Sequence, residues 1–463
     1  MNRLATLVGR SAVIASPADL DVYTSEPRGQ FHGRALCMVE PETPAKVAAF
    51  LSFCASRNIG VVPQGGNTGL VGGQTPDASG SQIILSLRRL RAIREIDPAS
   101  DAITVEAGLT LNETQEAAAS VNRYFPLSLA SGGSCTIGGN LATNAGGVHV
   151  LAYGMMRDLV LGLEVALADG RLLSTLGKLR KDNTGYDLTR LFIGSEGTLG
   201  VITAATLKLF PRPRGRAVVF VGLNDPAQAL ALLSFVRERA GPALQAFELI
   251  PRLGLDLVVR HIPGARDPLS APHCWYALIE LAVFADQGAD ALSAGMFEEA
   301  LANGVAEDAT LAQSLDQAAA LWKLRESLSE AQKRAGGSIK HDISIAINRI
   351  PEFIARAERR LGELFPDVRP VPFGHMGDGN LHYNVSQPEG GDRQAFLAQR
   401  NAINAIVHGL VHEFGGSISA EHGIGALKRD LLKQVKDPVA LDVMRAIKST
   451  LDPAGILNPG KLL

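Results

Sequence analysis

Two histidines flank an Asp-Gly pair in the segment HMGDGNLHYN, residues 375–384. Asp-Gly is a strong turn signal, so the chain before it can fold back on the chain after it. Beyond the turn, alternate residues of a strand face opposite ways, which puts His382 and Asn384 on one face. His375 can then approach His382, and two converging imidazoles suit a divalent metal.

A second loop offers a third ligand. The segment SISAEHGIG, residues 417–425, carries Glu421 and His422 in a glycine-flanked loop. The alternative is a surface hairpin with incidental histidines, because the H-x6-H spacing is not a specific metal pattern. The metal hypothesis is favoured because the first segment lies between hydrophobic strands and the second brings another Glu-His pair.

Glycine is concentrated in the segment VVPQGGNTGLVGG, residues 61–73, which directly follows a predicted strand. Glycines let the backbone approach a ligand closely, and successive N–H groups can form a nest for a pyrophosphate without a cationic side chain. A surface loop is the alternative, but it would not need five glycines here. The usual phosphate motifs, G-x-x-x-x-G-K-[ST] and a helix-opening G-x-G-x-x-G, do not fit, which excludes a Rossmann site for a dinucleotide.

Two further glycine-rich segments follow. SGGSCTIGGNLATNAGG, residues 131–147, contains three Gly-Gly pairs with Thr143 and Asn144 among small residues. This pattern indicates backbone pressed against a flat polar ring. KDNTGYDLTRLFIGSEGTLGVIT, residues 181–203, leads through Gly194, Gly197 and Gly200 into a strand.

Two basic residues lie on predicted regular elements. A helix over roughly 313–335 places Arg325 and Ser329 four residues apart on one face. In SIKHDISIAI, residues 338–347, Lys340 projects from the face opposite the isoleucines. On the residues alone, solvent-facing charges are the usual reading of both.

Helices and strands must position these groups. A helix capped by Thr43 with Pro44 at its first position precedes the first glycine loop. Strands are predicted over 83–87, 103–107, 161–168 and 201–209, and PRPRG at 211–215 marks a domain boundary. A chain of 463 residues is too long for one ordinary core, so two or three domains are expected.

The composition is that of a globular protein, with 46% hydrophobic and 20% charged residues and a net charge of −2. This balance gives no electrostatic case for a nucleic-acid partner or an anionic membrane. No apolar run is long enough for a transmembrane segment, and Gly9, Arg10 and Ser11 interrupt any secretory signal. The sparse cysteines, Cys37, Cys54, Cys135 and Cys274, suggest reduced thiols in a cytoplasmic protein.

The three glycine-rich segments, in this order and spacing, resemble the FAD-binding domain of the vanillyl-alcohol oxidase / p-cresol methylhydroxylase (PCMH) flavoproteins. The resemblance implies an α+β fold with a two-subdomain FAD-binding domain of the PCMH type at 1–213. It implies an α+β substrate (cap) domain at 214–420, with an antiparallel sheet and the metal site. The C-terminal segment, 421–463, is expected to pack back on the FAD domain.

The resemblance also implies a set of residues that bind FAD. They are Pro63, Gly65, Gly66, Asn67, Thr68, Gly69, Gly133, Ser134, Gly138, Gly139, Asn140, Thr143, Asn144, Gly146, Gly147, Gly197, Gly200, Val201, Ile202 and Asn458. Covalently flavinylated relatives attach FAD through His or Cys, and the first glycine loop here has no His. Non-covalent FAD is therefore expected, with His32, His149 and Cys135 as weaker alternatives.

GHMGDGNLHYNV and SAEHGIG resemble the paired motifs of the D-2-hydroxyglutarate dehydrogenase and D-lactate dehydrogenase subfamily. The resemblance implies zinc or another divalent metal on His375, His382 and Glu421, with His422 as general base. LWKLRE and SIKHDIS match that subfamily too, which implies that substrate is bound by Arg325, Ser329, Lys340 and Asn384. Ser329 stands where the family often has Thr, which weakens any inference about substrate length.

The implied reaction is oxidation of a D-2-hydroxyacid to the 2-oxo acid, with hydride transfer to flavin N5. An Arg together with a Lys favours a dicarboxylate such as D-2-hydroxyglutarate. D-lactate dehydrogenase and a glycolate oxidase flavin subunit are the nearest alternatives, and a zinc hydrolase is one from a different class. No nicotinamide motif is visible, so an electron-transfer flavoprotein, a quinone or a cytochrome is the expected electron acceptor, and a homodimer is the base-rate expectation.

Overall fold

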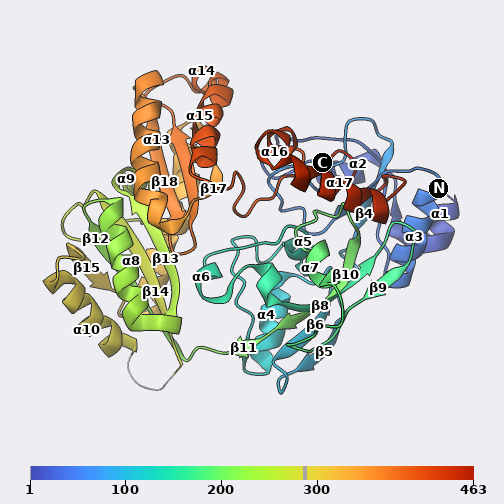
Figure 1. Cartoon of the computed structure of the whole chain (residues 1–463), viewed down its shortest axis with the longest axis horizontal. Helices are drawn as coiled ribbons and strands as arrows, with labels where there is room; N and C mark the ends of the chain where they lie inside the picture. Colours follow the sequence, from blue (N-terminus) through green and yellow to red (C-terminus); the bar gives the residue numbers. More distant parts are fainter. Residues whose placement is uncertain (1, 285–288) are drawn as a thin grey trace. The chain divides into compact units, whose positions relative to one another are not determined.

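The structure is a computed structural model that describes residues 2–284 and 289–463. It divides into two compact units, each with its own sheets and helices (Figure 1). Of the described residues, the first unit contains 2–147, Tyr153–Arg212 and Glu421–Leu463; the second contains Val148–Ala152, 213–284 and 289–420. The short segment Val148–Ala152, from the middle of the first unit's chain, was not expected in the second.

A four-stranded sheet of the first unit has the order β1 (Val13–Ile14), β2 (Ala35–Val39), β4 (Gln82–Ser86), β3 (Val61–Gln64). Strands β2, β4 and β3 are parallel, and β1 is antiparallel to β2. Helix α3 (Pro44–Ala55) is capped by the Thr43 side chain, with Pro44 in its first turn, as the sequence predicts. Helix α1 (Asn2–Val8) precedes β1, and α2 (Pro17–Leu20) lies between β1 and β2 in the chain.

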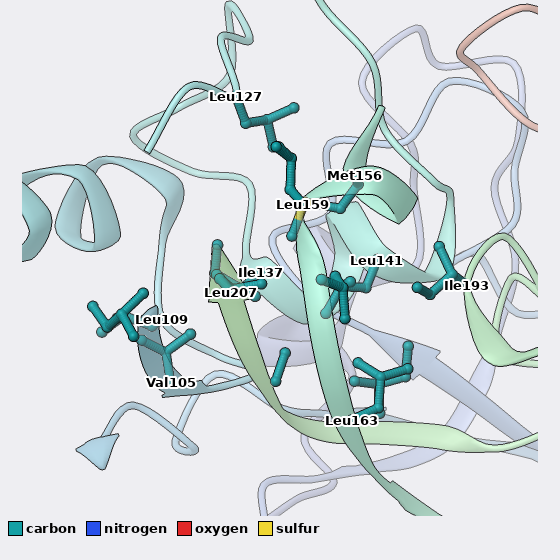
Figure 2. Close-up of a cluster of buried hydrophobic side chains, with 14 of the residues drawn as sticks. Val105, Leu109, Leu127, Ile137, Leu141, Met156, Leu159, Leu163, Ile193 and Leu207 are labelled. Atoms are coloured by element: carbon teal, nitrogen blue, oxygen red, sulfur yellow. The ribbon is translucent and has the colours of Figure 1, made fainter. Parts of the chain in front are cut away.

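A five-stranded antiparallel sheet has the order β5 (Ile93–Asp97), β6 (Ala102–Glu106), β10 (Val201–Lys208), β8 (Val160–Ala166), β9 (Leu172–Ser174). The strands predicted near these positions are therefore confirmed. Figure 2 shows part of the hydrophobic core against this sheet, including Leu141 of α5 (Ile137–Ala142), Leu163 of β8 and Leu207 of β10. The remaining elements in this stretch are α4 (Leu111–Ser120), β7 (Arg123–Tyr124), α6 (Val150–Tyr153), α7 (Leu188–Phe192) and β11 (Phe210–Pro211).

The C-terminal segment belongs to the first unit, as expected. After α16 (Arg429–Val435) and α17 (Pro438–Leu451), Leu457 forms a parallel bridge with Val61 of β3. The Val61 N–H donates to Ile456 O, and the Asn458 N–H donates to Val61 O, each at 2.8 Å. These bonds hold the chain end against the strand that leads into the first glycine loop.

The second unit is built on an antiparallel sheet of eight strands. Seven follow the order β15 (Asp308–Leu311), β12 (Gly215–Leu223), β14 (Trp275–Val283), β13 (Leu244–Pro251), β18 (Arg369–His375), β19 (Asn380–Ser386), β16 (Ser338–Ile339), and β17 (Asp342–Ser344) also pairs with β19. All eight residues of β13 are buried, so this strand is covered on both faces.

Helices cover this sheet. Side chains from α9 (Arg252–His261), α11 (Leu315–Glu326) and α12 (Leu328–Ala335) form one hydrophobic cluster with Phe220, Tyr276 and Phe373. Helices α8 (Pro226–Ala240), α10 (Ala289–Ala302), α13 (Ile350–Leu364), α14 (Arg393–Ala398) and α15 (Arg400–Glu413) complete the unit (Figure 1). Among the described residues, no helix has both the length and the hydropathy needed to span a bilayer.

Candidate functional site

A cavity of about 430 Å³ lies within the first unit, and the predicted glycine loops form most of its wall. Strand β3 ends at Gln64, and the loop from Gly65 to Val71 that follows it lines the cavity. The second wall comes from α5 and the chain after it, and the third from Glu196–Ile202 before and within β10. Glu421 and His422 also line it.

The first two glycine segments pack backbone to backbone. A Cβ on Gly66 would lie 1.9 Å from Ser134 O, and one on Gly65 would lie 2.4 Å from Thr136 Oγ1. Neither distance allows a side chain, so these glycines are required by the fold of the wall itself. Thr136 caps α5 by accepting from the Gly139 N–H, which fixes the second segment in this position.

Most of the residues predicted to bind FAD line this cavity. Those that do are Pro63, Gly65, Gly66, Asn67, Thr68, Gly69, Gly138, Gly139, Asn140, Thr143, Gly146, Gly197, Gly200, Val201 and Ile202; those that do not are Gly133, Ser134, Asn144, Gly147 and Asn458. Asn458 lies behind the wall, where its Nδ2 donates to Gly73 O at 2.9 Å and to Glu196 O at 2.7 Å. It braces two lining segments rather than facing the cavity.

The prediction missed Glu196, a lining residue 8% exposed with a positive φ of 52°. Its carboxylate accepts the N–H groups of Ile424 and Gly425, each at 2.7 Å. Burial raises the pKa of this carboxyl, against the opposing effect of these two hydrogen bonds. Glu196 therefore anchors the loop that carries His422, and the only sequence signal was its place in the quoted GSEGTLG segment.

The cavity fits a flavin dinucleotide in its chemistry. No lysine or arginine is among the described residues that line it, so a phosphate there would be held by backbone N–H groups and hydroxyls. Of the described lining residues none is a cysteine, and His422 is the one histidine among them. Of the other attachment candidates, His32 Nδ1 pairs with Ser25 Oγ at 2.6 Å, and His149 lies in the second unit, 3.4 Å from a Glu280 oxygen.

The two histidines of the opening motif meet in the second unit. Strands β18 and β19 pair in antiparallel register with Phe373 opposite His382, which makes His375 the diagonal neighbour of His382. Their ring centroids lie 5.5 Å apart, and a nitrogen of one ring lies within 4.8 Å of a nitrogen of the other. The predicted convergence of His375 and His382 is confirmed.

Each of these histidines faces a buried carboxylate. Glu248 is the cross-strand partner of His375, and its Oε1 lies 2.5 Å from His375 Nδ1. Asp342, opposite His382 on β17, has its Oδ1 4.0 Å from His382 Nδ1, and Asn380 Nδ2 donates to the same Oδ1 at 3.1 Å. A carboxylate behind an imidazole is the arrangement that orients histidine ligands of metals.

Arg325 shares this site. Its Nε donates to Glu248 Oε2, and its Nη2 lies 3.5 Å from His375 Nε2. Burial alone would raise the pKa of Glu248, but the charges of Arg325 and His375 hold it well below its ordinary value. Glu248 was not predicted, and nothing in the local sequence around it marks it.

The other predicted substrate residues are more scattered. Asn384 is buried, with its Nδ2 donating to Gln332 Oε1 at 2.8 Å, whereas Ser329 and Lys340 are exposed. The single helix predicted over 313–335 is wrong: α11 ends at Glu326 and α12 begins at Leu328. Ser327 both closes the first helix and starts the second, so Arg325 and Ser329 lie on different helices.

Comparison with known proteins places the chain in a family. Residues 35–176 match the family model described as an FAD binding domain, and residues 212–462 match that described as FAD linked oxidases, C-terminal domain. The mitochondrial D-2-hydroxyglutarate dehydrogenase of Bos taurus is 41% identical over 453 residues, covering 97% of this chain and 81% of that protein. The D-2-hydroxyglutarate dehydrogenase of Xanthomonas citri pv. viticola is 37% identical over 446 residues, covering 96% and 93%.

A solved structure shares the fold. The p-cresol methylhydroxylase crystal structure with substrate bound superposes with a TM-score of 0.74 at 17% identity, covering 100% of this chain and 95% of that one. The likeness to this structure shows the fold, and the two family matches together with the relatives named D-2-hydroxyglutarate dehydrogenase show that the chain belongs to the FAD-linked oxidases.

Proposed function

We propose that the protein is an FAD- and divalent-metal-dependent D-2-hydroxyacid dehydrogenase, with D-2-hydroxyglutarate as the favoured substrate. The observation that carries the proposal is the pair His375 and His382, each facing a buried carboxylate, with the Arg325 guanidinium 3.5 Å from His375 Nε2. A metal ligand beside a fixed guanidinium suits a substrate that carries a carboxylate next to a hydroxyl.

Glu421 is the proposed third ligand. It follows Ala420, whose N–H lies 3.4 Å from the O atom of Asp342, the residue opposite His382. Chain connectivity thus brings Glu421 within one residue of the strand that faces the histidines. Two imidazoles and a carboxylate form a donor set typical of catalytic zinc.

When bound, FAD would supply a hydride acceptor, and a divalent cation held by His375, His382 and Glu421 would supply a Lewis acid that makes the substrate hydroxyl more acidic. His422 takes the hydroxyl proton of the substrate, which requires the neutral imidazole. Loss of that proton and of the α-hydrogen with its electron pair leaves the 2-oxo acid. Arg325 grips the carboxylate bidentately, and Lys340 adds a point charge for a second, distal carboxylate.

FAD is held non-covalently in the cavity of the first unit, and the electrons leave to an electron-transfer flavoprotein, a quinone or a cytochrome. A homodimer in the cytoplasm stays the expectation. A zinc hydrolase would leave the family match and the glycine-walled cavity without a role.

A substrate screen tests the proposal. The purified enzyme, supplied with zinc and an artificial dye acceptor, is assayed with D-2-hydroxyglutarate, D-lactate, D-malate and glycolate. The highest kcat/KM is expected with D-2-hydroxyglutarate. A preference for D-lactate or glycolate would replace it with one of the two nearest alternatives, and no turnover with any of them would refute the proposal.

A further inference from the structure

We infer that Glu248 is a positioning residue that holds a metal ligand and the substrate clamp in one fixed arrangement. The inference deepens the proposed function and rests on it. One carboxylate, with one oxygen for each partner, binds both His375 and Arg325. None of the motifs that indicate the metal site or the substrate site contains this residue.

The sheet register sets the arrangement. Strands β13 and β18 pair with Glu248 directly opposite His375 and Leu249 opposite Gly374. Gly374 has a φ of 146°, and a Cβ there would lie 2.9 Å from Asn380 O, so the strand is closely packed where it meets the turn. Glu248 is 0% exposed, so its side chain cannot leave these two partners for solvent.

The hydrogen bond to Glu248 fixes the tautomer of His375. A carboxylate accepts only, so the ring nitrogen 2.5 Å from Oε1, Nδ1, carries a proton. The other nitrogen, Nε2, is then the one that can bind a metal. A negative charge behind the ring also raises the basicity of that nitrogen toward the metal.

The second oxygen orients Arg325. Because Glu248 Oε2 accepts the Nε–H, the guanidinium is held with its Nη2 3.5 Å from His375 Nε2. The ring of Phe373 lies under the guanidinium, 5.0 Å from Cζ to the centroid, and limits its rotation. Metal ligand and clamp are thereby adjacent, so one substrate can engage both.

The competing account is a buried ion pair that serves stability alone. A matched control exists on the neighbouring strand. Glu280 of β14 is 6% exposed and accepts a hydrogen bond from Trp322 Nε1 at 2.7 Å, but it contacts none of the proposed metal ligands His375, His382 and Glu421. Replacing either glutamate by Gln removes one buried negative charge and keeps the shape. Only Glu248→Gln should affect metal and substrate.

The experiment compares the FAD-loaded parent, Glu248→Gln, Glu248→Asp and Glu280→Gln. Zinc dissociation constants come from competition with a chelator, thermal unfolding from calorimetry, and kcat and KM from assays at saturating zinc. Glu248→Gln is expected to weaken zinc binding by about 10–100-fold and, at saturating zinc, to raise the KM for D-2-hydroxyglutarate. Glu248→Asp keeps the charge and should lose less zinc affinity, while Glu280→Gln should bind zinc like the parent.

Parental zinc affinity and KM in folded Glu248→Gln would overturn the inference, as would an equal loss of zinc affinity in Glu280→Gln. If Glu248→Gln does not fold, Glu248→Asp decides: zinc affinity below the parental value supports the inference, and parental affinity refutes it. The parent separates the two claims. If it binds no zinc or oxidises no D-2-hydroxyacid, the proposed function fails. If it does both and folded Glu248→Gln has the parental zinc affinity and KM, the inference alone fails.

Discussion

The rings of His375 and His382 lie 5.5 Å apart, centroid to centroid, in a T-shaped arrangement. They are diagonal neighbours on two strands joined by the turn at Asp378 and Gly379. If this pair holds a catalytic metal, dialysis against a strong chelator should abolish hydroxyacid oxidation and leave the flavin bound. Activity assays and the flavin absorbance of the dialysed protein check this, and zinc should restore the rate.

His382→Ala should reproduce the chelator effect without a chelator. The side chain is partly exposed, so its loss is not expected to unfold the sheet. The matched control is His412→Ala, an exposed histidine on α15. Full activity in the metal-free parent would contradict a metal site at these histidines.

His422→Ala tests the general base. Removing a proton acceptor of this kind should lower the rate of flavin reduction by roughly 10²–10⁴-fold, because the hydroxyl proton then has no positioned partner. FAD content should stay at the parental level, since His422 is one lining residue among many. Stopped-flow measurement of flavin reduction by D-2-hydroxyglutarate gives this rate. A parental rate in the variant would show that His422 is not the general base.

If Lys340 binds the distal carboxylate of the substrate, its removal should affect dicarboxylate and monocarboxylate substrates differently. Lys340 is exposed, so Lys340→Ala should fold normally. It is expected to raise the KM for D-2-hydroxyglutarate by roughly tenfold, the loss of one charged hydrogen bond, and to leave the KM for D-lactate nearly unchanged. Lys333→Ala, an exposed lysine of α12, is the control. An equal change in KM for both substrates would show that Lys340 does not bind a distal carboxylate.

Arg325→Lys should raise the KM for both substrates. Lysine keeps a positive charge near Glu248 but cannot reproduce the planar, bidentate grip of a guanidinium. Arg325→Ala is the poorer choice, because it leaves Glu248 buried without its cation at a cost of about 3–5 kcal/mol. Steady-state kinetics with both substrates measure the effect, and an unchanged KM in a folded variant would exclude Arg325 as the clamp.

Gly139→Ala probes the FAD cavity. A Cβ there meets only Thr136 Oγ1, at 3.4 Å, so the change fits the protein but adds a methyl group to the wall. FAD affinity should fall by roughly tenfold, the cost of modest overpacking, and the stability of the apoprotein should not. Gly409→Ala, with nothing within 4 Å, is the control.

Acid precipitation of the parent should release all flavin into the supernatant; flavin in the pellet would show covalent attachment.

Local sequence signals predicted the parts of the site that local structure builds. The Asp378-Gly379 turn brings His375 onto His382 because hairpin strands pair with their nearest neighbours in sequence. The glycines of the cavity wall could be found because a close backbone approach excludes every other residue, as at Gly66.

The contacts that sequence reasoning missed are long-range. Glu248 lies 127 residues before His375, and only the pairing of β13 with β18 brings them together. Glu196 reaches Ile424 across 228 residues. The break between α11 and α12 at Ser327 was also missed, because the apolar stripe of Leu321, Leu324 and Leu328 continues across it and all three stay buried.

The most direct test of the central claim is anaerobic mixing of the zinc-supplied holoenzyme with D- and L-2-hydroxyglutarate. The proposed chemistry predicts that the D isomer bleaches the bound flavin and yields one 2-oxoglutarate per flavin, while the L isomer leaves the spectrum unchanged. A flavin that stays oxidised with D-2-hydroxyglutarate and with every other D-2-hydroxyacid, in protein shown to contain zinc, would contradict it.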